Sequence, residues 1–179
     1  IIKKSGFDGK YILLSSVSVY SNNIKYVNKD TSLDPWNEYG ESKVKKEIFI
    51  SDYQKKMGNI FHIVRPSGIL GLSMHGTFIR RITDNALSNK DIFIFGKKSY
   101  FNNIIGVDNL VRIILKLLEI DENKKIVLGS KSPLTLFQIA NLILDSTRSN
   151  SKIIVKEMGR EPFIIDDNCW LGFEEYIQT

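Results

Sequence analysis

The sequence contains one cysteine, two histidines and no long apolar run, and each of these shortages excludes a class of protein. A single cysteine, Cys169, cannot form an internal disulfide or a cysteine-based zinc site. Two histidines are too few for a histidine-rich cluster, so we expect no bound metal. No run of about 18 apolar residues is present, and residues 1–6 lack the apolar core of a secretory signal. We therefore expect a cytoplasmic protein that does not bind membranes.

The chain also lacks a strong imbalance of charge, since lysine and arginine are only slightly in excess of aspartate and glutamate. The 179 residues carry a formal net charge of +5, and 42% of them are hydrophobic, as in an ordinary globular protein. A basic excess can indicate nucleic-acid binding, but the densest patch with aromatic neighbours, residues 97–101, is short and has no stacking platform around it. Scattered solvated lysines account for the charge, and we expect no nucleic-acid partner.

The first part of the chain has the pattern of a strand, a helix and a second strand. Short apolar runs at residues 11–14 and 61–64 predict buried strands. Between them we expect a helix that starts at Asp34–Pro35 and ends near Met57, with Gly58 as its stop. In a unit of this kind the two strands are parallel. The inner face of the helix is expected to contain Val44, Ile48 and Ser51.

Hydroxyl and glycine-containing segments follow the two predicted strands. Three serines, Ser15, Ser16 and Ser18, come directly after the first strand, and a loop over residues 65–71 comes after the second. Ligands of open α/β sheets bind at the carboxyl ends of the strands, so both segments are candidates for one site. Tyr20 is expected to support its wall.

Beyond residue 71 the pattern becomes mixed. The elements expected there are helices over 77–88, 109–119 and 135–146 and strands over 92–95, 126–129 and 153–155. Asp108 is expected to cap the second of these helices, and Thr135 with Gln138 forms a capping box for the third. We place a boundary near residue 72, between a sheet-rich part (1–71) and a mixed part (72–179). The fold class is α/β.

Tyr39 and Lys43 are four residues apart on the first expected helix, so their side chains lie on one face. A nearby ammonium favours the phenolate form of a tyrosine, and such a phenol can exchange a proton with a substrate hydroxyl or carbonyl near neutral pH. A serine hydroxyl from the adjacent strand end would hold the same substrate oxygen. The spacing alone occurs by chance on many solvated helices, so the prediction depends on the order of the surrounding elements.

That order resembles the extended short-chain dehydrogenase/reductase family, of the nucleotide-sugar epimerase and dehydratase type. The stretches that carry the resemblance are LSSVSVY (14–20), PWNEYGESK (35–43), VRPSGILG (64–71), GVDNL (106–110) and KIVLGS (125–130). The resemblance covers nearly the whole chain. It implies the C-terminal part of a Rossmann-like parallel sheet together with a small mixed α/β substrate domain.

The resemblance also assigns roles by position. Tyr39 would be the catalytic acid/base, Lys43 would support it and contact the nicotinamide ribose, and Ser16 would hydrogen-bond the substrate oxygen. Pro66 and Ser67 would border the nicotinamide of NAD or NADP. Further residues expected near the substrate are Ser18, Gly68, His75 and Asn102. The implied whole protein is an NAD(P)-dependent epimerase, dehydratase or reductase that acts on a small molecule, with a nucleotide sugar as one option, and it forms a homodimer.

Two departures from the family pattern limit this assignment. No G-x-x-G-x-x-G loop occurs, so we expect about half of the nucleotide-binding domain to be missing. Without this loop the chain alone should bind dinucleotides weakly and be inactive. The strand over residues 11–14 would lack its usual neighbours, so we also expect self-association. Many nucleotide-sugar members have Asn in place of Gly68 and a diphosphate-binding Arg in place of Asn102. Arg80 and Arg81 are alternatives for that arginine, although a solvated helix face explains them better. A non-catalytic binding or structural module that keeps the fold is the second interpretation.

His62 lies inside an apolar strand and is expected to be a hydrogen-bonded core histidine, rather than a catalytic one.

Overall fold

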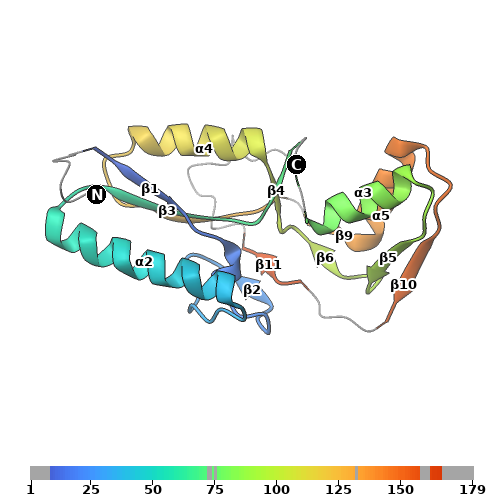
Figure 1. Cartoon of the computed structure of the whole chain (residues 1–179), viewed down its shortest axis with the longest axis horizontal. Coiled ribbons are helices and arrows are strands. Elements are labelled where there is room, and N and C mark those ends of the chain that lie inside the picture. Colours follow the sequence, from blue (N-terminus) through green and yellow to red (C-terminus); the bar gives the residue numbers. More distant parts are fainter. Residues whose placement is uncertain (1–8, 72–73, 75, 132, 158–161, 167–179) are drawn as a thin grey trace.

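The computed structural model describes residues 9–71, 74, 76–131, 133–157 and 162–166. In Figure 1 these residues form two lobes that lie end to end along the long axis. Each lobe has its own cluster of buried apolar side chains. The candidate site residues of the sequence come mainly from the first lobe, so its construction is described first.

The first lobe is built on a parallel sheet in the order β1–β3–β8. Its strands are β1 (Tyr11–Leu14), β3 (Phe61–Pro66) and β8 (Lys125–Leu128). The predicted parallel pairing of the first two strands is confirmed, with Tyr11 opposite Phe61 and Leu14 opposite Val64. Figure 1 shows helix α2 (Glu38–Met57) on one face of this sheet and helix α4 (Val107–Glu119) on the other. The sheet is therefore covered on both faces, as in doubly wound α/β folds.

Helix α2 ends where the sequence predicts, but it begins later. Gly58 closes the helix in the left-handed conformation, with φ of 72°, which a residue without a Cβ adopts at little cost. The start at Asp34–Pro35 is wrong, because Asn37 is the N-cap. Its side-chain oxygen accepts a hydrogen bond from the Gly40 backbone N–H at 2.8 Å, which satisfies one of the free donors of the first turn.

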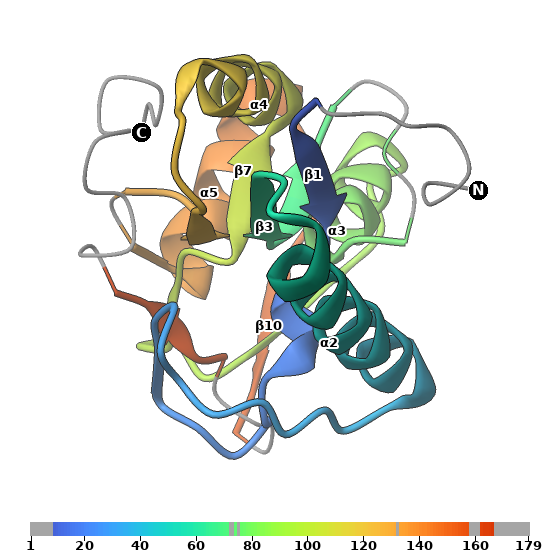
Figure 2. The same cartoon turned by 90° about the vertical axis from the view of Figure 1, so that its left-hand side faces the viewer.

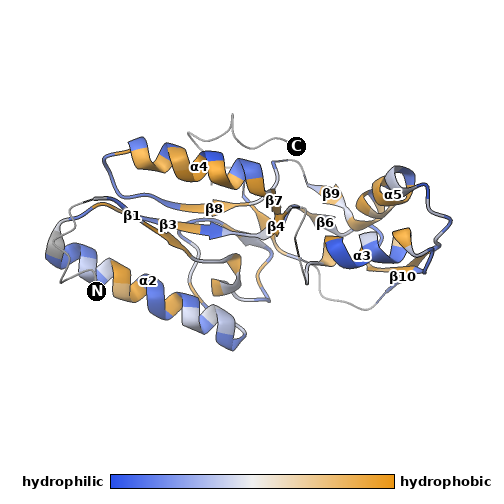
Figure 3. Cartoon of the chain, turned by 45° about the horizontal axis from the view of Figure 1, so that its top comes forward, coloured by the Kyte–Doolittle hydropathy of each residue, from blue (hydrophilic) through white to orange (hydrophobic). Residues whose placement is uncertain are grey.

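The inner face of α2 is also more polar than expected. Val44 packs against the core of the first lobe, but Ile48 is 55% exposed, so its predicted inward orientation is wrong. The adjacent residue, Glu47, is buried instead. Figure 3 shows the difference between the two helices, since α4 is largely hydrophobic whereas hydrophilic and hydrophobic residues are mixed along α2.

Two further expectations about local structure are corrected. The segment 65–71 is not a loop, because β3 continues to Pro66 and β4 (Gly68–Leu70) pairs in parallel with β7 (Ile104–Gly106). Asp108 is not a cap, because α4 begins at Val107 and its N-cap, Gly106, makes no side-chain hydrogen bond. Asp108 lies in the first turn, where its carboxylate interacts favourably with the helix dipole.

The second lobe packs two helices on a pair of parallel strands. Its elements are α3 (Phe78–Leu87), α5 (Leu136–Thr147), β5 (Ile92–Phe95) and β10 (Ile153–Lys156), and β5 pairs with β10. Ile92 and Ile94 are buried against the helices, whereas Phe93 and Phe95 alternate to the open face. The capping box at Thr135 is confirmed, and Thr77 caps α3. A short antiparallel pair, β6 (Tyr100–Phe101) with β9 (Leu134–Thr135), adjoins this lobe (Figure 1). Figure 2 turns the first lobe toward the viewer and shows strands β1 and β3 between helices α4 and α2.

The last described strand returns to the first lobe. β11 (Ile164–Ile165) pairs in parallel with β2 (Tyr26–Val27), and Ile165 is part of the first core cluster. Both lobes therefore use residues from beyond position 72, and the domain boundary placed there stays a prediction. Within the described part of the chain, no helix combines the length and hydropathy required to cross a membrane.

Candidate active site

The first turn of α2 lies against the serine segment that follows β1 because Gly40, in that turn, has no side chain. A Cβ built on Gly40 would stand 2.2 Å from the carbonyl oxygen of Ser18 and 2.8 Å from the Cβ of Pro35. Ser18 belongs to a short 3-10 helix, η1 (Val17–Val19), which Ser16 caps through its side-chain oxygen. This close approach brings the helix face that carries Tyr39 next to the serine segment.

A cavity of about 350 Å³ opens at this junction. Five of the residues predicted for the site line it: Ser16, Tyr39, Lys43, Pro66 and Ser67. The remaining lining residues are Leu14, Ser15, Ile69 and Thr77. The cavity therefore lies at the carboxyl ends of β1 and β3 and reaches the N-cap of α3, so both lobes contribute to its wall.

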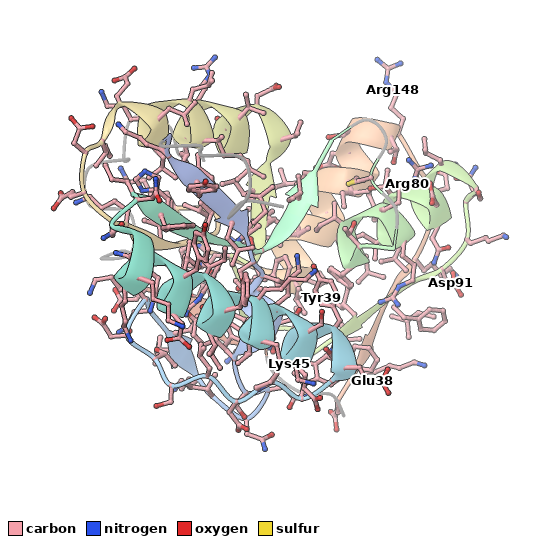
Figure 4. The ribbon with its side chains drawn as sticks, turned by 60° about the vertical axis from the view of Figure 1, so that its left-hand side comes forward. Glu38, Tyr39, Lys45, Arg80, Asp91 and Arg148 are labelled. Atoms are coloured by element: carbon pink, nitrogen blue, oxygen red, sulfur yellow. The ribbon has the colours of Figure 1, made fainter. Side chains whose placement is uncertain are left out.

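Lys43 is held in place by the strand end, and Tyr39 stands beside it. The Lys43 ammonium donates a hydrogen bond to the Leu14 carbonyl oxygen at 2.9 Å. Its Nζ lies 5.4 Å from the centre of the Tyr39 ring. Tyr39 is 55% exposed, so its phenol is open to an incoming ligand while it lines the cavity. In Figure 4 it projects from α2 on the side nearest the second lobe, away from Glu38 and Lys45.

A buried polar network includes Ser15, one of the residues that line the cavity, and the sequence did not reveal it. The Arg65 guanidinium binds Glu47 through two hydrogen bonds, from Nε to Oε1 at 3.0 Å and from Nη2 to Oε2 at 2.6 Å. Glu47 also accepts a hydrogen bond from the Ser15 hydroxyl at 2.5 Å, and Arg65 donates to the Tyr20 hydroxyl at 2.7 Å. Burial alone would lower the pKa of Arg65, but its hydrogen bonds and the charge of Glu47 outweigh burial and raise it.

Ser67 has a hydroxyl that is suited to a ligand. The residue is only 7% exposed, and its Oγ has no hydrogen-bond partner among the described residues. Its backbone N–H is already used by the Leu128 carbonyl oxygen at 2.9 Å. A buried hydroxyl without a partner is costly, and Ser67 lines the cavity, so it is a candidate for contact with a bound polar group.

Of the other predicted substrate residues, Ser18, Gly68 and Asn102 are not among those that line this cavity. Asn102 is fully buried, and its amide binds both the carbonyl oxygen and the N–H of Ile165, at 2.9 and 3.0 Å, while its contact with a substrate stays a prediction. Ser18 accepts a hydrogen bond from Ser16, and Gly68 lies in β4 with the Asn103 carbonyl oxygen 3.2 Å from where a Cβ would be. His75 and Cys169 lie outside the described residues.

His62 is buried in the core, as expected, but it is not well hydrogen-bonded. Neither ring nitrogen makes a hydrogen bond of good geometry, although the nearby Leu117 carbonyl slightly favours the charged form. Burial, and then the charge of Lys10, lower the pKa of His62. The ring is therefore a neutral part of the core.

A second, larger cavity adjoins the first. It has a volume of about 1020 Å³ and shares Ile69 with the smaller one. Arg80 lines it and is paired with Asp84, with Nε 2.8 Å from Oδ1, while Arg81 stacks over Phe78. Neither arginine lines the smaller cavity. Across the described residues, no three histidine, cysteine or acidic side chains gather as a metal site would require.

A parallel α/β sheet that is covered by helices on both faces, with a cavity at its carboxyl edge, defines a Rossmann-like protein, and ligands of such folds bind at that edge. The chain belongs to the NAD dependent epimerase/dehydratase family, whose model matches residues 1–129. No curated protein sequence matches the chain significantly.

Solved structures of sugar epimerases share this fold. The UDP-glucuronic acid 4-epimerase of Bacillus cereus, in complex with NAD, superposes with a TM-score of 0.82 at 21% identity over 99% of this chain and 58% of its own. The UDP-Glc/GlcNAc 4-epimerase of Campylobacter jejuni superposes with a TM-score of 0.80 at 17% identity, over 96% of this chain and 60% of its own. The UDP-glucose 4-epimerase of Thermotoga maritima, with UDP-glucose, superposes with a TM-score of 0.74 at 21% identity, over 90% of this chain and 55% of its own. The expected fold is thus confirmed, and the chain spans somewhat more than half the length of these proteins.

Proposed function

We propose that this chain carries the acid–base part of an NAD(P)-dependent epimerase, dehydratase or reductase that acts on a nucleotide sugar or a related hydroxyl or carbonyl compound. The observation that carries the proposal is the cavity, because Ser16 from the segment after β1 and Tyr39 and Lys43 from α2 line it together. Such a set is what proton exchange with a substrate oxygen requires.

Each of the three residues has a role that its surroundings support. Ser16 donates a hydrogen bond to the substrate oxygen and fixes its position. Tyr39 transfers the proton, since its phenol lines the cavity and remains open to solvent. Lys43 places its positive charge next to the Tyr39 ring and is held there by the Leu14 carbonyl.

The residues present fit the nicotinamide end of the cofactor. The unpaired Ser67 hydroxyl offers a hydrogen bond to a polar group, Pro66 provides an apolar surface, and Lys43 reaches the same space. When bound, the dinucleotide would supply hydride acceptance and return at the substrate carbon. The sequence has no glycine-rich loop for the pyrophosphate, so we propose that this chain alone binds dinucleotides weakly and does not turn over substrate.

The substrate class and the assembly follow from the same proposal. The epimerase structures with a similar fold include complexes with UDP-glucose and with UDP-glucuronic acid, which makes a nucleotide sugar the first substrate to test. Residues 1–71 would form the cofactor and catalytic part, and residues 72–179 the substrate part with segments that return to the sheet. The protein would act in the cytoplasm as a homodimer.

A ligand titration of the 179-residue chain tests the location of the site. With millimolar nicotinamide mononucleotide, NMR shift changes are expected at Ser16, Lys43 and Ser67, and Ser67→Ala should weaken them, whereas the exposed control Lys45→Met should not. Shifts elsewhere only, or none, would refute the nicotinamide site. Micromolar affinity for NAD or NADP would contradict the proposed weak binding.

Kinetics on a longer protein that contains this chain tests the chemistry. Tyr39→Phe should lower kcat by at least about 100-fold, since general acid–base catalysis contributes at that level. Unchanged turnover would refute the role of Tyr39. The second candidate, a non-catalytic binding module, is favoured by the missing glycine-rich loop, and it would show ligand binding without turnover.

A further inference from the structure

Two successive residues at the end of β1 are bound by two side chains that lie one turn apart on α2. The Leu14 carbonyl oxygen accepts a hydrogen bond from Lys43 at 2.9 Å. The Ser15 hydroxyl donates to Glu47 at 2.5 Å. Lys43 and Glu47 are four residues apart on one face of α2. Their two contacts with the strand end therefore prevent the helix from sliding along its own axis and from rotating about it.

Glu47 is itself held by Arg65, a buried residue with several hydrogen-bond partners. Arg65 lies within β3 and is buried. Besides its paired hydrogen bonds to Glu47, it donates to the Tyr20 hydroxyl at 2.7 Å and to the Lys29 carbonyl oxygen at 3.2 Å. A guanidinium with this many partners in a fixed fork holds its carboxylate in one geometry.

Burial of such a pair is a poor way to gain stability alone. The desolvation of two charges offsets most of their attraction, and apolar side chains of similar size are often as stable at such positions. An apolar pair would pack the helix against the sheet without fixing its register. The charged pair gives directional contacts, and Glu47 also accepts a hydrogen bond from Ser15, which lines the cavity.

We propose that Glu47 and Arg65, acting through Ser15, are positioning residues that hold Lys43 and Tyr39 in register with Ser16. The proposal deepens the proposed function and rests on it, because the register matters only if these residues act on one substrate oxygen. A displacement of about 1 Å between catalytic groups can lower a rate about 100-fold. Glu47 and Arg65 touch no ligand themselves in this scheme.

The position of α2 relative to the end of β1 can be measured without any ligand, through the reactivity of the lysine amines of the helix. In the native chain, acylation of Lys43 should be slower than that of Lys45 and Lys46, which are exposed on the same helix and serve as internal references. The labelled chain is digested with a protease that does not cut at lysine, and the rates are read by mass spectrometry. The ratio of the Lys43 rate to the reference rates reports its anchoring to Leu14.

Ser15→Ala removes one hydrogen bond from the network and keeps the charged pair. It should raise the relative reactivity of Lys43 about five-fold, the change in population that one hydrogen bond typically controls. Glu47→Gln should raise it at least as much. The double variant should show no more than Glu47→Gln alone, because both changes break the same contact.

Ser149→Ala is the matched control, since Ser149 also donates a short hydrogen bond, to the Ala86 carbonyl oxygen at 2.6 Å, but in the second lobe. It should leave the Lys43 ratio unchanged. If Ser15→Ala folds and its ratio equals that of the native chain, the positioning role is wrong, whether or not Glu47→Gln folds. Because no nucleotide is present, this outcome is independent of the ligand titration that tests the proposed function.

Discussion

Gly40→Ala is the substitution for which the structure gives the sharpest expectation. The new Cβ would stand 2.2 Å from the Ser18 carbonyl oxygen and 2.8 Å from the Cβ of Pro35. The first contact is with backbone, which cannot rotate away as the end of a long side chain could. Overpacking of this kind costs up to about 3 kcal/mol, and the better helix propensity of alanine returns about 1 kcal/mol. The net expectation is a loss of about 2 kcal/mol in the free energy of unfolding.

Urea denaturation followed by circular dichroism measures this loss. Gly106→Ala is the control, because its Cβ would come no closer than 3.9 Å to a neighbouring atom, the Asn109 Nδ2, and at most about 1 kcal/mol is expected there. Since α2 must move away from η1, the Gly40 variant should also release Lys43 in the acylation assay. A Gly40→Ala protein as stable as the native chain would show that the close approach of helix and serine segment is not required.

Three other substitutions or conditions have defined outcomes. Burial lowers the pKa of His62 below its ordinary value of 6.5, so the unfolded chain takes up a proton that the folded chain resists. The free energy of unfolding, measured with urea, should therefore be constant above pH 6.5 and fall below it, and His62→Leu should flatten this pH profile. Arg65→Ala leaves the charge of Glu47 buried without its partner and should cost about 3–5 kcal/mol, and a thermal shift of less than a few degrees would contradict this. Asn102→Ala removes both hydrogen bonds to Ile165 and should speed hydrogen exchange at the Ile165 amide, with unchanged exchange as the contrary result.

The site was largely predictable because its residues obey simple periodicities. Apolar runs marked β1 and β3, parallel pairing brought their carboxyl ends to one edge, and helical spacing placed Tyr39 and Lys43 on one face. The resemblance to a family then selected Ser16 among three adjacent serines. That Ser16, Tyr39 and Lys43 line one cavity agrees with this prediction, while their catalytic roles remain to be tested.

The errors arose where the local sequence allows more than one structure or where burial depends on a partner far away in the sequence. Asp34–Pro35 is a good helix start, but Asn37 is an equally good cap nearer to the helix, and local sequence cannot choose between them. Glu47 and Arg65 were not foreseen because charged residues are seldom buried, and only their partner across the fold makes burial acceptable. The hydrogen bonds of Asn102 to Ile165 could not be foreseen either, because the two residues are more than 60 positions apart in the sequence.

The chain passes between the two lobes four times: after β4, after β6, after β8 and after β10. Because each lobe is built from several separate segments, cleavage of one peptide bond cannot separate the lobes, and neither lobe can be expressed alone as a continuous segment. Any hinge between the lobes must bend several crossing segments together, which favours a small, concerted closing motion over a wide swing. The cavity that Tyr39 lines also has Thr77, the N-cap of α3, in its wall, so a change in the angle between the lobes would change the width of this cavity.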